Sequence, residues 1–390
     1  MDTKIGVFMK LEIDSIEVFA VIGPDTKYKT SSHYSDLVIT NTIVKIRTTD
    51  GYEGFGGAIS WTEGGVDKSL AESIRHLMPF LIGKSALQRE EIHSLMASRC
   101  VLMQPQALSP IDIALWDLVS KYAKMPLYHF LGGTRSKILS YASTPFLPSI
   151  QDYIEHVQEL KDKGYKYIKF HTWCIFDKDM ALVSAIYDVF KDSDLKFMLD
   201  VESSYNREEA LKAAKILEAY DYLWFEAPLL DTDLEGYKEL KSRVDIPILA
   251  AGNTLLHLNQ IEQGIQSNCW SKVRVDATLA GGITQTRKIM GIAEANSMTV
   301  ELQSWGYTLS QAANLHLMLA YNNSTYFEQA VPVEPLEFGA LTTIRTDQDG
   351  YVHAPEGDGL GIEMDWPLIE QSSHFRLALD STGWKEFTSQ

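Results

Sequence analysis

At 390 residues the chain is long enough for more than one domain, and 45% hydrophobic with 22% charged residues is ordinary for a soluble globular protein. The net charge of −17 leaves no basic excess to neutralise phosphates, which argues against nonspecific nucleic-acid binding. The three cysteines form no CxxC pair, which excludes a thiolate zinc cluster and a disulfide scaffold. No apolar run approaches the roughly 18 residues of a membrane helix, and the N-terminus resembles no signal peptide. We therefore expect a soluble, cytoplasmic protein.

The N-terminal part of the chain is expected to be an α+β domain over residues 1–132. The alternating stretch TIVKIRTTDGYEGFGGA turns at Asp50-Gly51, a pair typical of β-hairpins. A helical pattern follows, and in SPIDIALWDLVSKYA we expect Ser109 to cap a helix and Pro110 to be its first residue. A hairpin followed by helices indicates the α+β class.

From residue 133 to 346, short apolar runs alternate with amphipathic helical stretches. The strand candidates are KILSYAST, KYIKFH, KFMLDVE, YLWFEAP, IPILAAGN, KVRVDAT, MTVELQS and TYFEQAV. Near-continuous apolar strands that alternate with helices predict a parallel sheet, and eight units in about 200 residues predict a closed (β/α)8 barrel. Residues 347–390 begin with a turn-rich, irregular stretch.

Each strand candidate from the second onward ends in a polar residue. These residues are Lys169 with His171, Asp200, Glu226, Asn253, Asp276, Gln303 and Glu328. A single carboxylate at such a position often caps the next helix. Because the C-terminal ends of barrel strands meet at one rim, a whole series in phase predicts an active site there.

Three adjacent strands end in residues that offer only oxygen ligands, namely Asp200, Glu226 and Asn253. Oxygen donors with room left for water and substrate suit Mg²⁺. Lys169 and His171 would flank the metal. Such a site is suited to removing the proton next to a carboxylate, with the metal, Lys169 and Glu328 stabilising the enediolate that results.

These segments resemble the enolase superfamily and, within it, the mandelate racemase branch of acid-sugar dehydratases and racemases. IKFH stands where the family has its Lys-x-Lys base motif, and MLDVE, WFEAP and LAAGN match the metal-ligand strands. RVDATLAGGIT matches the sixth strand, and SPIDIALWDL with LYHFLGG matches the hinge between capping domain and barrel. The resemblance implies one Mg²⁺ per subunit, a small-molecule carboxylate substrate and a homo-oligomer, either dimer or octamer. It also implies that residues 347–390 return to complete the capping domain.

The chain departs from the family pattern at three positions. The second basic position usually holds lysine, and here His171 either acts as the base or only hydrogen-bonds the substrate beside Lys169. Gln303 replaces the usual histidine partner of Asp276, and an amide cannot exchange protons, which disfavours two-base racemisation. Asn253 replaces the usual glutamate and removes one negative charge.

Further residues are expected near the substrate. Glu202 is either an acid acting on a leaving group or a solvated loop carboxylate. The resemblance implies that capping-domain loops cover the substrate through Lys29, His33, Tyr34 and Trp61. We expect a Mg²⁺-dependent lyase that dehydrates a polyhydroxy acid. A racemase, epimerase or cycloisomerase acting on a carboxylate, and a non-catalytic ligand-binding protein, are the alternatives.

Overall fold

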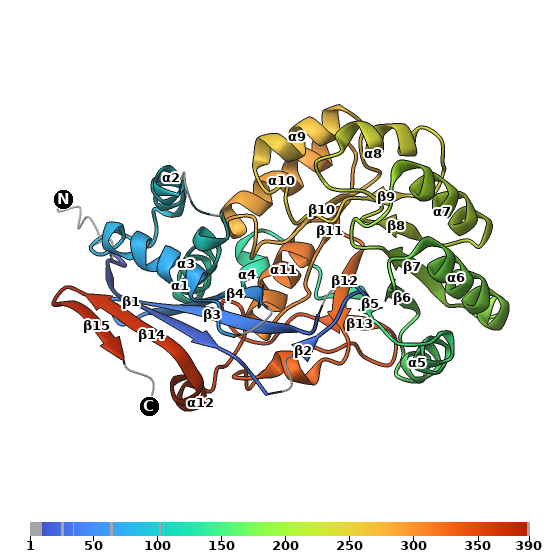
Figure 1. The fold of residues 1–390 in the computed structure, drawn as a ribbon. Coiled ribbons are helices and arrows are strands. Elements are labelled where there is room, and N and C mark those ends of the chain that lie inside the picture. The colour runs from blue at the N-terminus through green and yellow to red at the C-terminus, as the bar shows by residue number, and fades with distance from the viewer. Residues whose placement is uncertain are drawn as a thin grey trace.

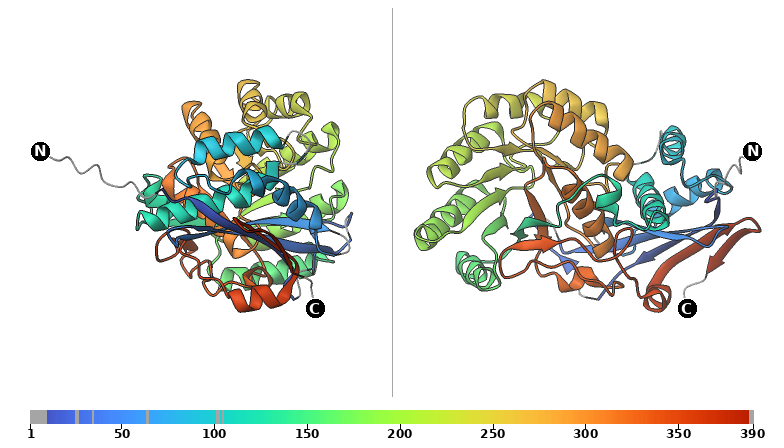
Figure 2. Two further views of the ribbon diagram at one scale, coloured as in Figure 1. Left: turned by 90° about the vertical axis from the view of Figure 1, so that its left-hand side faces the viewer. Right: turned by 180° about the vertical axis from the view of Figure 1, so that it is seen from behind.

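The structure is a computed structural model that describes residues 10–24, 27–33, 35–62, 65–100, 103 and 105–387. The chain forms a capping domain and a barrel that lie side by side (Figure 1). Figure 2 shows the same division from behind in its right view and the capping domain in front of the barrel in its left view. Within the described residues, no helix combines the length and the apolar content that crossing a lipid bilayer requires.

The capping domain is built on an antiparallel sheet in the order β15-β14-β1-β3-β2, with β4 also paired to β3. The strands are β1 (Ile13–Val21), β2 (Lys27–Tyr28), β3 (Leu37–Thr48), β4 (Glu53–Thr62), β14 (Ser373–Asp380) and β15 (Gly383–Phe387). The predicted hairpin is confirmed: β3 pairs with β4 around a turn in which Gly51 has a φ of 84°. Because β14 pairs with β1, the C-terminal segment does complete the capping domain.

The helices of the capping domain are α1 (Lys68–Leu77), α2 (Arg89–Arg99) and α3 (Ser109–Tyr122), with short 3₁₀ helices at Met78–Phe80 and Pro105–Leu108. α3 is buried over most of its length, and it packs on β4 because the strand carries glycine at the contact. A Cβ atom at Gly56 would lie 2.1 Å from the carbonyl oxygen of Pro110. Any larger residue there would push the helix away from the sheet.

The expected cap of α3 was wrong. The helix begins at Ser109 itself, after Leu108, so Pro110 is its second residue. The Ser109 hydroxyl instead accepts a hydrogen bond at 3.0 Å from the backbone nitrogen of Gly281, in the barrel. The side chain therefore joins the two domains, and a contact across domains leaves no local sequence signal.

The barrel contains all eight predicted strands. They are β5 (Lys137–Ser143), β6 (Tyr167–His171), β7 (Lys196–Asp200), β8 (Trp224–Glu226), β9 (Ile248–Leu249), β10 (Val273–Val275), β11 (Val300–Leu302) and β12 (Tyr326–Ala330). The helices of this part are α4 (Leu127–Phe130), α5 (Ile150–Asp162), α6 (Phe176–Phe190), α7 (Arg207–Ala219), α8 (Leu234–Lys241), α9 (Leu258–Gln266), α10 (Ile283–Ala295) and α11 (Thr308–Ala320). After β12 come a 3₁₀ helix (Glu334–Glu337), β13 (Tyr351–His353), which pairs with β5, and α12 (Trp366–Ser372).

Serine side chains complete the ring where strand pairing stops. Backbone pairing runs from β12 through β5 to β9 and separately joins β10 to β11. Between β9 and β10, Ile248 donates to Ser271 Oγ at 3.1 Å. Between β11 and β12, Ser304 Oγ donates to the carbonyl oxygen of Glu328 at 3.0 Å and accepts from its nitrogen at 3.1 Å. The barrel is thus closed, partly through hydroxyl groups.

Candidate active site

The C-terminal ends of β6, β7 and β8 bring basic and acidic side chains together. Lys169 and His171 are two residues apart on β6 and therefore point to the same side of the strand. Parallel pairing sets His171 beside Asp200 at the end of β7, and Asp200 beside Glu226 at the end of β8. The register alone places His171, Asp200 and Glu226 at one level of the barrel, and Lys169 lies two residues before that level, opposite Met198.

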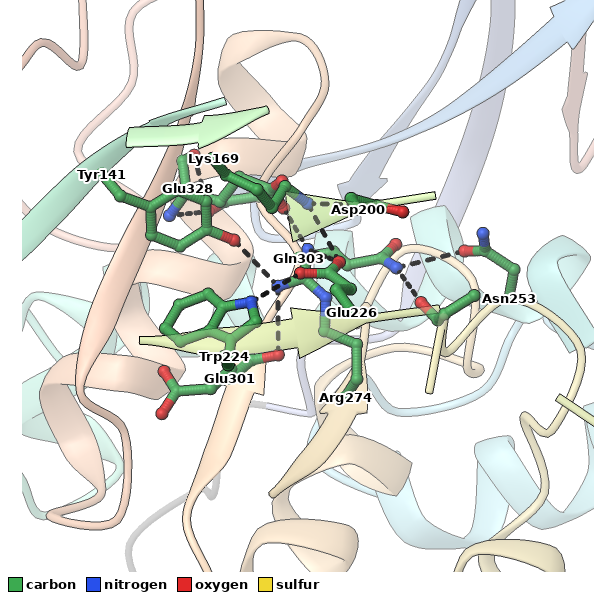
Figure 3. A network of polar contacts seen from close by, with 12 residues as sticks. Tyr141, Lys169, Asp200, Trp224, Glu226, Asn253, Arg274, Glu301, Gln303 and Glu328 are labelled. Carbon is green, nitrogen blue, oxygen red and sulfur yellow. Dashed lines mark hydrogen bonds and ion pairs between the residues drawn. The ribbon is translucent and has the colours of Figure 1, made fainter. Parts of the chain in front are cut away.

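Lys169 lies at the centre of a buried network of ion pairs (Figure 3). Its Nζ lies 3.2 Å from Asp200 Oδ2 and 2.9 Å from both Glu226 Oε1 and Glu328 Oε1. Burial by itself lowers the pKa of Lys169, but Glu226 and Glu328 raise it, and the resulting pKa lies well above its ordinary value. Lys169 is therefore a fixed positive charge, poorly suited to accepting a proton.

A second buried cation, Arg274 on β10, belongs to the same network (Figure 3). Its Nη2 lies 2.9 Å from Glu226 Oε1 and 2.8 Å from Glu328 Oε2, and its Nη1 donates to Tyr141 Oη at 3.1 Å. Burial raises the pKa of Glu328, but Arg274 and Lys169 outweigh burial and lower that pKa to about 2. Arg274 was not predicted, although an arginine between two valines in an apolar strand is a signal for a paired buried charge.

His171 presents one ring nitrogen to the cavity. Its Nδ1 lies 2.6 Å from the carbonyl oxygen of Thr144, and because a carbonyl oxygen only accepts, Nδ1 carries the hydrogen. Nε2 faces the carboxylates, 3.4 Å from Asp200 Oδ2 and 3.6 Å from Glu202 Oε1. Burial lowers the pKa of His171, but hydrogen bonding to Asp200 and its charge raise that pKa further than burial lowers it. Nε2 is thus the ring atom that can take up or release a proton.

Two overlapping sets of side chains at this level can hold a cation. Asp200 and Glu226 both contact Lys169 Nζ, so one positive charge already lies between them. Asn253, on the loop after β9, lines the same cavity, and the three together offer the oxygen donors that a hard divalent cation prefers. The second set is His171, Asp200 and Glu202, whose ligand atoms lie within 4.8 Å of one another. An imidazole ligand suits a softer transition metal.

On the opposite side of the rim, the residues that follow β9 and β11 are uncharged amides, whereas β10 between them carries Arg274. Gln303, which follows β11, donates from Nε2 to the carbonyl oxygen of Ala251 and, at 3.2 Å, to Asn253 Oδ1. These bonds use both amide hydrogens, so only the Gln303 carbonyl oxygen is left for a ligand. Gln303 can therefore accept a hydrogen bond from a ligand hydroxyl group but has no donor to spare.

A buried carboxylate that was not predicted holds the loop that carries Asn253. Asp231 accepts hydrogen bonds from the backbone nitrogens of Ala251 at 2.7 Å and of Asn253 and Thr254 at 3.1 Å. The Thr254 hydroxyl adds a fourth bond at 3.0 Å. Asp231 stands in the loop after β8, off the strand-end series, so no periodic pattern indicates it.

Asp276, the predicted sixth-strand carboxylate, packs against α11. Its Oδ1 accepts hydrogen bonds from Asn314 Nδ2 at 2.8 Å and from the backbone nitrogen of Thr278 at 2.7 Å. Burial raises the pKa of Asp276 to about 6. Asp276 is not among the described residues that line the cavity. Its catalytic role therefore stays a prediction from resemblance.

A cavity of about 310 Å³ lies above the network. Every predicted strand-end residue except Asp276 lines it, as do Glu202 and Arg274. The capping domain closes it with Tyr28, Thr30, Leu37 and Trp61, next to Trp305 from the loop after β11. The cavity therefore has a charged floor on the barrel and a largely apolar wall on the capping side.

Both domains match known family models. Residues 24–132 match the mandelate racemase/muconate lactonizing enzyme N-terminal domain, and residues 152–368 match the enolase C-terminal domain-like family. The chain belongs to the mandelate racemase/muconate lactonizing enzyme family. The family lies within the enolase superfamily, and the resemblance inferred from the strand ends is confirmed.

Several relatives of this family member have known activities or structures. L-talarate/galactarate dehydratase of Salmonella typhimurium LT2 is 30% identical over 332 residues, which cover 83% of this chain and 80% of the relative. A crystal structure of a family protein from Pseudovibrio sp. is 42% identical with a TM-score of 0.93, covering 95% of this chain and 99% of the other. The 3,6-anhydro-D-galactonate cycloisomerase of Zobellia galactanivorans is 26% identical with a TM-score of 0.81, covering 93% and 99%. The relatives are enolase-superfamily enzymes, but they differ in reaction type.

Of the four capping-domain residues that were expected to contact the substrate, only some line the cavity. Trp61 lines the cavity. Lys29 and His33 are not among the described lining residues: Lys29 Nζ lies 5.3 Å from the centre of the Phe146 ring, and His33 Nε2 lies 3.1 Å from the carbonyl oxygen of Cys174. Tyr34 lies outside the described residues. That Tyr28, Thr30 and Leu37 line the cavity was not predicted. They lie in and between β2 and β3, and the sequence of such a segment does not indicate which side chains face a second domain.

Proposed function

We propose that this protein is a Mg²⁺-dependent lyase that removes the proton α to a carboxylate and dehydrates a polyhydroxy acid. One observation carries the proposal: in a single cavity, His171 Nε2 and the Lys169 ammonium face the carboxylates of Asp200 and Glu226. Membership of the family supports an enolase-type enzyme, and the dehydratase relative supports the reaction class.

The cofactor we propose is one Mg²⁺ per subunit, held by Asp200, Glu226 and Asn253. When bound, it supplies positive charge to the substrate carboxylate and so acidifies the α-proton. The oxygen-only donor set supports this choice over the set that contains His171.

The proposed chemistry uses residues on one side of the cavity. His171 Nε2 takes the α-proton, and the electron pair of the C–H bond moves into the carboxylate to give an enediolate. The fixed positive charge of Lys169 stabilises this anion. Collapse of the enediolate breaks the bond from the β-carbon to its hydroxyl oxygen, which leaves as water after protonation. The enol that remains becomes a 2-keto-3-deoxy acid.

We assign protonation of the leaving hydroxyl to Glu202. Its Oε1 lies 3.6 Å from His171 Nε2, and the side chain lines the cavity. Burial, together with the charge of Asp200, raises the pKa of Glu202, which favours the protonated form that an acid requires.

A second candidate is cycloisomerisation, in which a ring oxygen leaves from the β-carbon in place of a hydroxyl group. The 3,6-anhydro-D-galactonate cycloisomerase relative favours it, and it would use the same residues. Racemisation has less support, because Gln303 provides no proton on the opposite side.

The test is to incubate the enzyme with Mg²⁺ and a library of sugar acids in D₂O and to follow the products by NMR. Dehydration predicts a 2-keto-3-deoxy acid for at least one substrate, and a ring-bearing substrate would give the same product without releasing water. Deuterium at the α-carbon of an inverted acid, with no keto acid formed, would instead establish an epimerase and refute the proposal.

Calorimetric titration with Mg²⁺ separates the two ligand sets. Asn253→Ala should weaken Mg²⁺ binding by about 10-fold or more if Asp200, Glu226 and Asn253 hold the metal, since it removes one ligand. His171→Asn should then leave the affinity nearly unchanged. The reverse pattern would place the metal on His171, Asp200 and Glu202.

A further inference from the structure

The two ends of the cavity differ in charge. All of the basic side chains that line it, Lys169, His171 and Arg274, lie on the barrel floor, and each contacts carboxylates there. Among the described lining residues, a substrate carboxylate would therefore meet cationic side chains only at the floor. The free charge on the floor is small, because each cation already has anionic partners within 3.4 Å.

Among the residues that the structure describes, the capping side of the cavity lining includes no cation for a second carboxylate. Its described lining residues are Tyr28, Thr30, Leu37 and Trp61, and none carries a positive charge. In the sequence, the neighbouring residues outside the described part, Asp25, Thr26, Tyr34, Glu63 and Gly64, include no lysine or arginine either. The nearby Lys29 has its ammonium over the Phe146 ring. An anion at this end would lose hydration without gaining a partner, which is costly.

Tyr28 and Trp61 of the capping domain form an aromatic wall together with Trp305 from the barrel loop after β11. Tyr28 and Trp305 meet edge to face with ring centres 4.5 Å apart, and Trp61 meets Trp305 at 5.7 Å. Tyr28 is fixed by its hydroxyl, which donates to the carbonyl oxygen of Val331 at 2.6 Å. Trp61 is 41% exposed. An exposed tryptophan beside a cavity is a surface for the C–H face of a ligand.

We infer that the aromatic wall determines specificity, and that the substrate is a monocarboxylic acid whose remote part is uncharged and packs a C–H face, such as that of a sugar ring, on Trp61. The inference rests on the proposed function, because it takes the reacting carboxylate to be the one on the floor. It excludes aldaric acids, which carry a carboxylate at each end, as the preferred substrates.

The experiment compares matched pairs of aldonic and aldaric acids of the same configuration, together with a 3,6-anhydro ring acid. Binding is measured by calorimetry with Mg²⁺ present, in a His171→Asn background that prevents turnover. We expect monoacids to bind about 10-fold more tightly than their diacid partners, the ring acid most tightly. Trp61→Ala should weaken monoacid binding by about 10-fold and leave diacid binding nearly unchanged.

Trp384→Ala is the matched control. Trp384 has the same 41% exposure but lies on β15, where it packs against Arg75 far from the cavity lining. Tighter binding of diacids, selective loss of diacid binding in Lys29→Ala, or equal effects of the two tryptophan variants would each overturn the inference while leaving α-proton chemistry intact. Failure of every acid to bind would overturn the inference together with the proposed function. The expected binding pattern without any turnover by the wild type would support the inference and refute the function.

Discussion

The two sides of the barrel rim differ in charge although they are built from the same repeating unit. The side formed by β6, β7 and β8 carries Lys169, His171, Asp200 and Glu226, all of them buried. Lys169 pairs with both carboxylates, and His171 pairs with Asp200. The side formed by β9 and β11 presents the amides of Asn253 and Gln303. Between them β10 contributes Arg274, whose charge is paired with Glu226 and Glu328. An amide positions ligands but exchanges no proton near neutral pH. If the proposed function holds, the comparison predicts that proton transfer occurs on one face of a bound substrate.

The largest expected effect comes from removing the proposed base on the charged side. His171→Asn should lower the rate of α-proton exchange in D₂O by about 1,000- to 10,000-fold, since it removes proton transfer while its amide can still donate to the Thr144 carbonyl. The matched change on the neutral side, Gln303→Leu, should weaken substrate binding and preserve exchange. Exchange that survives in the His171 variant and is lost in the Gln303 variant would reverse the comparison.

The second expected effect separates charge from basicity at Lys169. Lys169→Arg keeps the positive charge, cannot be deprotonated, and places a wide guanidinium where a compact ammonium contacts three carboxylates. We expect kcat/KM to fall by about 100- to 1,000-fold with slow α-proton exchange still measurable by NMR. If exchange disappears while substrate binding is unchanged, Lys169 is the base and His171 is not.

The third expected effect is on the loop that carries Asn253. Asp231→Asn replaces a carboxylate that accepts four hydrogen bonds, so the loop should lose its fixed position and Mg²⁺ affinity should fall by about 10-fold in calorimetry. Asp233→Asn is the control in the same loop, because Asp233 caps α8 and pairs with the exposed Arg207. Equal losses in both variants would mean that Asp231 has no specific role.

The strand-end residues could be predicted because one regularity governs them. Parallel strands separated by helices bring their C-terminal ends to one rim, so position along the chain translates directly into position in space for Lys169, Asp200 and Glu328. That regularity predicted which residues come together but not where every side chain points. Asp276 follows the same rule, yet its carboxylate turns to the amide of Asn314 on α11.

The residues that were missed depend on contacts between distant segments. Arg274 is part of an apolar strand in the sequence. Its partners Glu226 and Glu328 lie on β8 and β12, which do not pair with β10, so these contacts form only once the strands are arranged as a barrel. Asp231 acts through backbone groups of another loop. Ser109 was predicted to cap α3, because serine before a helical pattern is a common N-cap. Its hydrogen-bond partner, Gly281, instead lies in the other domain.

The smallest expected effect on activity is at Asp276, the carboxylate turned away from the cavity. Asp276→Asn should change the rate of α-proton exchange by less than about threefold. The side chain is not among the described residues that line the cavity, and it accepts a hydrogen bond from Asn314 instead. A loss of exchange comparable to that of the His171 variant would instead place Asp276 in catalysis.

Asp276 should nevertheless change how stability depends on pH. Burial raises its pKa from 3.8 to about 6, so between these values the folded protein holds a proton that the unfolded chain releases. The stabilising contribution is complete below pH 3.8 and is lost as the pH rises through about 6. Relative to Asp276→Asn, the free energy of unfolding of the wild type should therefore fall by about 2–3 kcal/mol across this window. Urea unfolding of both proteins at a series of pH values measures the difference. If the free energies of unfolding of the two proteins changed in parallel with pH, the Asp276 carboxyl group would titrate in the folded protein as it does in the unfolded chain. A protonated Asp276 would then contribute nothing to stability.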